Sequence, residues 1–176
     1  MPRGQGGREG GRRLRECGST ERRGRFTIID HTADIGIAVV APDLAGLFEA
    51  AAFGLLALLG YRPGVQRDAS DSQGIAETQP GQGFAGMFRV ELSASDHEAL
   101  LVDWLNELLY LHDVEGRAPA HVKVESASGG RLSAVLSGRL ERAPDLVPRE
   151  VKAATFHGLH IAEGADGFSA TVIFDI

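Results

Sequence analysis

The pattern of apolar and polar positions predicts strands near both ends of the folded part of the chain. Residues 26–29 and 35–40 are rich in β-branched side chains, which favour strands, and the polar stretch Asp30–Asp34 separates them. Near the C-terminus, a turn over 164–167 and an apolar run over 168–173 predict a final strand. We therefore expect the fold to begin and end in β-structure.

Two segments carry apolar residues at helical spacing. The first covers 44–59, where Asp43 is a suitable N-cap and Gly60 a stop. The second runs to about residue 112, and Ser95 and Glu98 are expected to form a capping box, in which each side chain satisfies a free amide at the helix start. The apolar stripe that we expect to face the core consists of Leu101, Trp104, Leu105, Leu108 and Leu111.

Further strands are expected around the second helix. Alternating apolar and polar residues predict a half-buried strand over 88–92. The segments 122–124 and 132–136 predict a hairpin with its turn at Ser128–Gly130. The periodicity of 150–161 fits a strand or a helix, and we favour a strand.

The distribution of apolar residues predicts one folded domain. Residues 1–24 are rich in Gly and Arg and hold almost no apolar groups, so we expect a disordered extension. Residues 25–176 suit a single domain, interrupted at about 62–86 by a Gly-, Gln- and Ser-rich stretch that we expect to be a mobile loop. Strands without regular β–α alternation indicate an α+β fold, with mostly antiparallel strands packed against two main helices.

The charge of the chain is unevenly distributed. Residues 1–25 hold eight arginines and three glutamates, a net charge of +5, whereas the whole chain carries −6. The other residues therefore carry −11, and an acidic body repels phosphate backbones, which argues against strong direct nucleic-acid binding by the folded domain. The basic extension could itself touch RNA, but we favour a disordered segment or a start codon assigned too early.

Composition excludes several classes of protein. The apolar share of 43% and the charged share of 24% are ordinary for a soluble globular protein. The longest apolar stretches, such as 55–59, are too short to span a bilayer, and the N-terminus lacks the apolar core of a secretory signal. A single cysteine, Cys17, excludes an internal disulfide framework and a cysteine-based zinc site. We therefore expect a cytoplasmic protein with no membrane partner.

Three side-chain carboxylates are candidates for a binding site: Asp30 and Asp34 in the polar break, and Asp175 after the final strand. Ile176 is the last residue, so its α-carboxylate lies one residue from Asp175, and two oxyanions this close repel each other unless a cation or basic group lies between them. Together with Asp34 they would form an oxygen-only cage, which hard cations such as Ca²⁺ or Mg²⁺ prefer. Position alone leaves open that these are solvated turn residues and a frayed terminus.

Four motifs along the chain resemble those of the archease family. A DHTADIG-type motif is present as Asp30–Gly36, and a late (E)VKA-T-(Y/F)H segment as Glu150–His157. A short apolar-Asp-apolar C-terminus is present as Phe174–Ile176, and the stretch Trp104–Tyr110 resembles the second helix of the family. The resemblance extends from about Phe26 to the last residue and leaves out the long loop.

The resemblance implies an accessory protein rather than an enzyme, so no catalytic residues are expected. It implies a metal site built from the second aspartate of the DHTAD motif and the last two residues, which are Asp34, Asp175 and Ile176 here. The expected cofactor is a divalent cation, Ca²⁺ in the first place and Mg²⁺ or Mn²⁺ as alternatives. The implied partner is the GTP-dependent RNA-splicing ligase, which joins ends bearing 2′,3′-cyclic phosphate or 3′-phosphate in tRNA splicing or RNA repair. The resemblance further implies that this chain promotes guanylylation of that ligase and its successive turnovers.

Three further residues are expected to support the metal site. Asp30 and His31 lie in the same motif as Asp34, and we favour a bracing hydrogen bond for His31 because imidazole suits an oxygen-rich site poorly. Lys152 could reach a phosphate, reach a carboxylate of the partner or neutralise the acidic cage, and the residues leave these three roles open.

Two other functions compete with ligase activation. The archease resemblance also allows a chaperone-like modulator of tRNA-modifying enzymes, such as a tRNA cytosine methyltransferase. A metal-dependent hydrolase acting alone is disfavoured, because no base or nucleophile accompanies the carboxylates in the sequence. An activator of an RNA ligase is therefore our main expectation.

Overall fold

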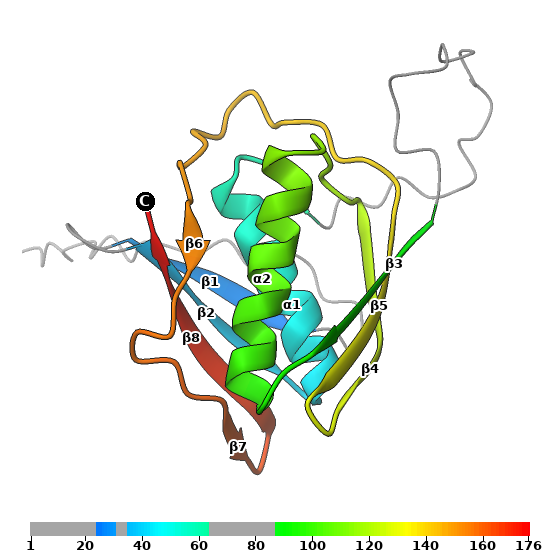
Figure 1. The fold of residues 1–176 in the computed structure, drawn as a ribbon. Coiled ribbons are helices and arrows are strands. Elements are labelled where there is room, and N and C mark those ends of the chain that lie inside the picture. The colour runs from blue at the N-terminus through cyan, green and yellow to red at the C-terminus, as the bar shows by residue number, and fades with distance from the viewer. Residues whose placement is uncertain (1–23, 31–34, 64–86) are drawn as a thin grey trace, which may run out of the picture.

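A computed structural model describes residues 24–30, 35–63 and 87–176 of the chain. The expected disordered extension at 1–24 and the expected mobile loop at 62–86 lie almost wholly outside these residues and stay predictions. Figure 1 shows the described elements, which are β1 (Arg25–Asp30), β2 (Ile35–Ala41), α1 (Leu44–Leu58), β3 (Phe88–Ser93), α2 (His97–Asp113), β4 (His121–Ser128), β5 (Arg131–Ser137), β6 (Ala153–Ala154), β7 (Ala162–Gly164) and β8 (Gly167–Asp175).

One sheet joins the first and the last strands of the described chain. Its order is β1–β2–β8–β6, with β7 also pairing with β8, and every pairing is antiparallel. The register of β2 and β8 runs from Ile35↔Phe174 to Ala41↔Phe168. Because β8 lies between β2 and β6, residues from three distant parts of the sequence meet at its C-terminal end.

The second described sheet is built around the expected hairpin. Its order is β3–β5–β4, again with antiparallel pairing. The turn between β4 and β5 holds Gly129 and Gly130 at φ values of 57° and 69°, a backbone region that glycine adopts without steric cost. The hairpin predicted from the apolar alternation is therefore confirmed.

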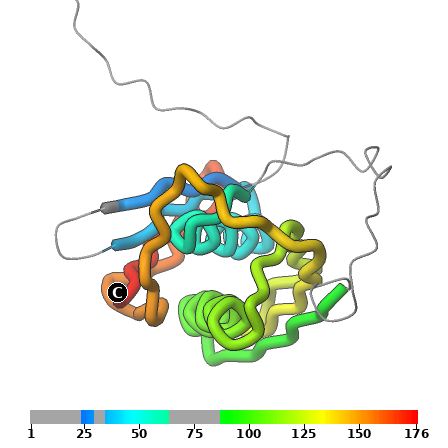
Figure 2. Tube along the Cα trace, turned by 90° about the horizontal axis from the view of Figure 1, so that it is seen from above, coloured from blue at the N-terminus to red at the C-terminus, as the bar shows by residue number. Residues whose placement is uncertain are grey.

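Helix α1 lies between the two sheets, as Figure 2 shows from above, and packs on β2 and β8 on one side and on β4 on the other. Its N-cap is Asp43, as expected, whose Oδ1 accepts from the Gly46 N–H at 2.7 Å. Small residues let the helix approach β2 closely, since a Cβ on Gly54 would stand 3.0 Å from the Ile37 side chain. The core therefore surrounds α1 on most of its faces.

Helix α2 packs against α1 through the apolar stripe predicted for it. Trp104 is fully buried, and its Nε1 donates to the Phe48 carbonyl at 3.0 Å, which satisfies the indole N–H inside the core. The five residues of the expected stripe are all buried. The α+β class, with antiparallel strands packed on two helices, is therefore confirmed.

The expected capping box of α2 is wrong. The N-cap is Asp96, whose Oδ1 accepts from the Ala99 N–H at 2.7 Å, while Ser95 Oγ donates to the other oxygen of Asp96 at 2.9 Å. The Oε1 of Glu98 accepts from the Ile161 N–H at 3.0 Å. The helix begins one residue later than the pattern suggested because the carboxylate of Asp96 is a stronger acceptor than a serine hydroxyl.

The strand favoured for 150–161 is also wrong for most of its length. Only Ala153–Ala154 pair as a strand, with β8. Beyond them the chain turns at Gly158, which has a φ of 63°, and the Leu159 N–H donates to the Phe156 carbonyl at 3.2 Å. Around this short strand, the backbone N–H groups of Lys152 and Thr155 bond to β8, and those of Ala154 and Ile161 bond to side chains of α2. No helix in the described residues is long and apolar enough to cross a membrane.

Candidate metal centre

The C-terminal end of β8 places Asp175 and Ile176 at the surface. Phe174 is buried and anchors the end of the strand in the core. Asp175 is exposed and Ile176 is 50% exposed, so the Asp175 carboxylate and the terminal main-chain oxygen are accessible to a cation. Alternation along the strand sends Asp175 to the face opposite the core, beyond the last buried side chain.

The register of β2 and β8 brings the DHTAD motif to this end of the sheet. Ile35, which directly follows Asp34 in the chain, pairs with Phe174, which directly precedes Asp175. Asp30 ends β1, and its backbone pairs with Ile35. The side chain of Asp30 and all of His31 and Asp34 lie outside the described residues, so their contacts stay predictions.

Lys152 contacts both C-terminal residues. Its main-chain N–H donates to the Asp175 carbonyl at 2.8 Å, and its Nζ donates to a main-chain oxygen of Ile176 at 3.0 Å. The ammonium group therefore lies beside a terminal oxygen of Ile176, one of the proposed ligands. A lysine in this position could neutralise negative charge at the chain end. Its side chain is exposed, and the other two expected roles, contact with a phosphate or with a carboxylate of the partner, stay predictions.

Two residues that the sequence reasoning passed over hold Lys152 in place. Asn106 of α2 accepts from the Ala154 N–H through Oδ1 at 2.8 Å and donates to the Ala154 carbonyl through Nδ2 at 3.5 Å. Thr155 donates to the Ile173 carbonyl twice, from its N–H at 3.0 Å and from its Oγ1 at 2.9 Å. A signal for Asn106 was present in the sequence, because it is a polar residue next to the apolar stripe of α2.

An open cavity of about 580 Å³ borders the site on the side of Lys152. It lies where the segment after β5 crosses the ends of the helices, and Arg149 donates its N–H to the Leu58 carbonyl there at 2.8 Å. The lining carries both signs of charge and consists of Leu59, His112, Asp113, Arg142, Pro148, Arg149, Glu150, Val151 and Lys152.

The described residues supply some, but not all, of the ligands that a hard cation needs. Asp175 and Ile176 supply oxygen atoms, the ligand type that Ca²⁺ and Mg²⁺ prefer. In residues 24–30, 35–63 and 87–176, no three His, Cys, Asp or Glu side chains gather in a way that could hold a metal ion. A complete site therefore needs a further ligand, and Asp34 precedes the strand that pairs with the end of β8.

Comparisons with known proteins give one consistent result. A model of the archease protein family matches residues 26–176. Protein archease of Archaeoglobus fulgidus is 36% identical over 155 residues, which cover 86% of this chain and 99% of that protein. Protein archease of Methanothermobacter thermautotrophicus is 32% identical over 154 residues, with coverage of 86% and 98%.

Two solved structures share the fold. The solution structure of Methanobacterium thermoautotrophicum protein 1598 has a TM-score of 0.56 at 28% identity and covers 86% of this chain and 98% of that one. The crystal structure of a Thermotoga maritima protein, described as an archease and possible chaperone, has a TM-score of 0.52 at 21% identity and covers 84% and 94%. The likeness to the second structure concerns the fold alone.

Proposed function

This chain belongs to the archease family, and we propose that it binds a divalent cation and activates a GTP-dependent RNA-splicing ligase. The ligase joins RNA ends bearing 3′-phosphate or 2′,3′-cyclic phosphate in tRNA splicing or RNA repair. The proposal makes this chain an accessory protein of the cytoplasm, which promotes guanylylation of the ligase and its repeated turnover.

The proposed ligands of the cation are Asp34, Asp175 and Ile176. The observation that carries this assignment is the pairing of Ile35 with Phe174, because each of these residues is the chain neighbour of one proposed aspartate ligand. An all-oxygen set favours Ca²⁺, with Mg²⁺ and Mn²⁺ as alternatives. Asp30 and His31, from the same motif as Asp34, are proposed to brace it.

Lys152 is proposed to keep the two C-terminal oxygen donors in position. Its two hydrogen bonds to Asp175 and Ile176 hold the chain end against β6. The bound cation would supply positive charge at the surface that meets the ligase, where it can attract a carboxylate or a phosphate. In this proposal the residues of this chain bind the cation and orient it toward the ligase. The ligase itself carries out the covalent chemistry.

A guanylylation assay with the ligase from the same organism tests the proposal. Transfer of labelled GMP to the ligase is followed with no added protein, with this chain, with Asp175→Asn and with Asp166→Asn. Asp166 is an exposed turn residue before β8 and serves as the matched control. We expect stimulation by the chain and by Asp166→Asn, and a loss of about tenfold or more for Asp175→Asn, because losing even a residue that only supports metal ligands commonly costs about tenfold or more. A ligase that is equally active without this chain would reject the proposed function.

A second candidate function is suggested by the description of the Thermotoga maritima protein as a possible chaperone. In that case this chain would keep a tRNA-modifying enzyme, such as a tRNA cytosine methyltransferase, soluble and specific. Light scattering of that enzyme during heating, with and without this chain, separates the two functions. Suppressed aggregation together with an unaffected ligase would favour the second function.

A further inference from the structure

Helix side chains close two strand edges of the described sheets. At the edge of β4, the Glu49 carboxylate of α1 accepts from the Val124 N–H at 2.9 Å. At the edge of β6, the side-chain amide of Asn106 exchanges two hydrogen bonds with the backbone of Ala154. Both contacts replace the ladder bonds that a further strand would make, so another chain cannot add to the sheet at these residues.

The edge of β3 is not closed in this way. The Ala94 N–H donates to the Gly130 carbonyl at 2.8 Å, and β3 pairs in register with β5 from Phe88 to Ser93. Since backbone direction alternates along an antiparallel strand, the N–H and C=O groups of Arg89, Glu91 and Ser93 point away from β5. No residue in the described part of the chain bonds to these backbone groups.

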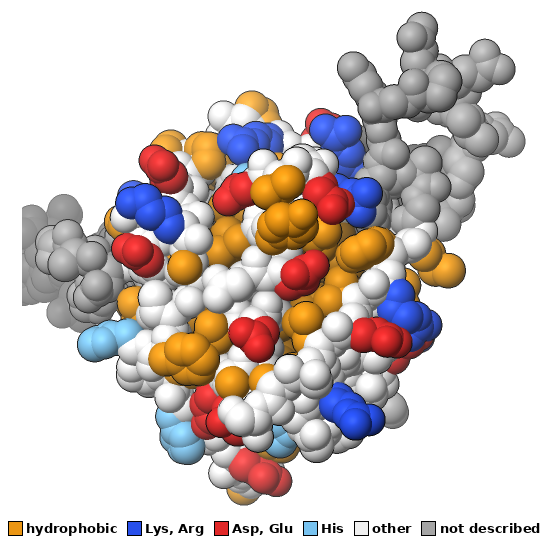
Figure 3. Space-filling model, in the orientation of Figure 1, with side chains coloured by type: hydrophobic (Ala, Val, Ile, Leu, Met, Phe, Trp, Pro, Cys, Tyr) orange, Lys and Arg blue, Asp and Glu red, His pale blue; other side chains and the backbone are white. Residues whose placement is uncertain are grey.

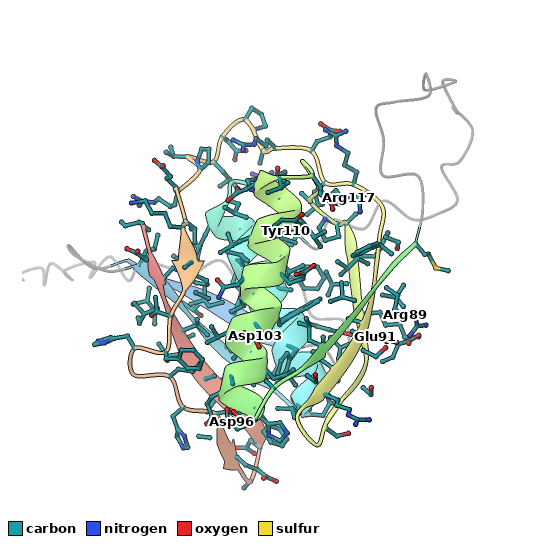
Figure 4. All side chains as sticks on the ribbon, in the orientation of Figure 1. Arg89, Glu91, Asp96, Asp103, Tyr110 and Arg117 are labelled. Atoms are coloured by element: carbon teal, nitrogen blue, oxygen red, sulfur yellow. The ribbon has the colours of Figure 1, made fainter. Side chains whose placement is uncertain are left out.

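An acidic helix face lies next to this edge. α2 packs against β3, and Figure 4 shows Asp103 and Tyr110 of α2 on the same face of the molecule as Arg89 and Glu91 of β3. Glu107 shares the face of Asp103, four residues further along the helix. Figure 3 shows apolar surface between acidic side chains on this face. An extended segment placed along β3 would therefore meet carboxylates on its α2 side.

These carboxylates are not neutralised within the described residues. No ion pair there joins Glu91, Asp103 or Glu107 to a basic side chain. The nearest basic side chain on β3, Arg89, is already engaged with Glu125 and Ser133 on the outer face of the sheet. Arg117 lies over the Phe88 ring and pairs with Glu115.

We propose that the free edge of β3 is a docking site for an extended basic segment of a partner protein, which adds to the sheet β3–β5–β4 as a fourth strand. The backbone of Arg89, Glu91 and Ser93 would supply its hydrogen bonds, and Asp103 and Glu107 would attract its Lys or Arg side chains. Charge complementarity selects this occupant. Two copies of this chain joined at β3 would instead bring identical, unneutralised carboxylates together. The surface lies on other elements than the proposed metal site and does not depend on that assignment.

The test uses the full chain and a synthetic peptide of about eight residues that alternates Lys and Val, long enough to cover one strand. Two matched peptides serve as controls, one alternating Glu and Val, and one of the original sequence with N-methyl groups on every backbone nitrogen. The second control keeps the charge but cannot form the ladder. We expect binding of the first peptide alone, with slowed hydrogen exchange at the amides of Arg89, Glu91 and Ser93.

Variants of the chain separate the two parts of the site. Glu91→Pro removes an outward N–H while keeping the bonds to β5, so peptide binding should be lost. Asp103→Lys should weaken binding by about three- to tenfold, and more at low salt, whereas Asp166→Lys should leave it unchanged. Circular dichroism establishes that each variant is folded, and exchange at Val90 and Leu92 reports whether Glu91→Pro keeps the β5 pairing.

Four results would overturn the proposal. They are equal binding of the N-methylated peptide, protection at β1 instead of β3, undiminished binding to Asp103→Lys, and a β3-linked dimer of this chain that excludes the peptide.

Discussion

Asn106 and Ala154 pair as two neighbouring strand residues would, although one partner is a side chain. The Asn106 amide accepts from the Ala154 N–H and donates to the Ala154 carbonyl. This contact ties α2 to β6, and β6 directly follows Lys152, which contacts the end of β8. The position of the candidate metal centre therefore depends on a residue that is not a proposed ligand.

Asn106→Ala should lower the free energy of unfolding by about 1–3 kcal/mol, because the backbone groups of the buried residue Ala154 lose their partner. Cation affinity should fall as well, since β6 is held less firmly. Asp103→Ala is the control on the same helix and should change stability by less than about 0.5 kcal/mol. Chemical denaturation measures the first effect and calorimetry of Ca²⁺ binding the second. Equal stabilities of the two variants would contradict the bracing role.

Asp34→Ala and Asp175→Ala should each weaken the binding of Ca²⁺ while leaving the fold intact. Each replacement removes one charged ligand from a small oxygen cage, and it also relieves repulsion between carboxylates in the metal-free protein. Without metal, the stability of the variants should therefore equal or exceed that of the parent. Isothermal titration with Ca²⁺ gives the affinities, and an unchanged affinity for either variant removes that residue from the site.

Two proteins with the same N-terminal tag test the part played by Ile176. One ends at Ile176, and the other continues with a short Gly-Ser segment. The extension converts the α-carboxylate to a neutral amide and leaves one carbonyl oxygen, so cation affinity and ligase stimulation should both decrease. Equal performance of the two proteins would strike Ile176 from the ligands and leave the aspartates in place.

The basic N-terminal extension is expected to be dispensable. A protein starting at Arg25 lacks most of the arginine-rich segment but keeps every residue that matches the family model. It should fold normally and stimulate the ligase as well as the full chain. A tenfold drop in stimulation at physiological salt would instead assign a function to the extension.

Glu98 should make the stability of the protein sensitive to acid. The hydrogen bond from the Ile161 N–H lowers the pKa of Glu98 in the folded state, and partial burial opposes this effect. Since the folded pKa is lowered, the stabilisation is complete above the unfolded pKa of about 4.3 and is lost as the pH falls below it. Glu98→Gln should flatten this loss, and Glu163→Gln on β7 should not. Thermal unfolding measured between neutral and acidic pH compares the three proteins.

Asp96 also makes the stability of the protein fall at acidic pH. Hydrogen bonds from the Ala99 N–H and the Ser95 hydroxyl lower its pKa, so protonation at acidic pH weakens the cap of α2. The residual acid sensitivity of Glu98→Gln is therefore expected to be small but present.

Local patterns were sufficient to predict the elements whose contacts are local. The cap at Asp43, the buried stripe of α2 and the Gly129–Gly130 turn each depend on residues a few positions apart, and all were predicted correctly. The capping box failed because Ser95 and Asp96 are adjacent and both suit an N-cap. The Asp96 carboxylate is the stronger acceptor and takes the cap, while Glu98 bonds to Ile161, which lies far along the chain.

The difference between local and long-range contacts also explains how much of the candidate site could be predicted. The Asp175 and terminal carboxylates are identifiable from charge, and their relation to the DHTAD motif comes from the resemblance. The hydrogen bonds between Lys152 and the end of β8 required the pairing of β6 with β8, which no periodicity indicates. The segment 150–161 was assigned wrongly because Asn106 and Ile173 determine its course.

The pairing of β2 with β8 has a consequence for the order of folding. Ile35 and Phe174 come from opposite ends of the described chain, so their contact closes a very long loop and carries a large entropic cost. The hairpin of β4 and β5 closes a short loop and can form early. Because the candidate cation site lies at the end of this long-range pairing, we expect it to be completed only after the local hairpin has formed.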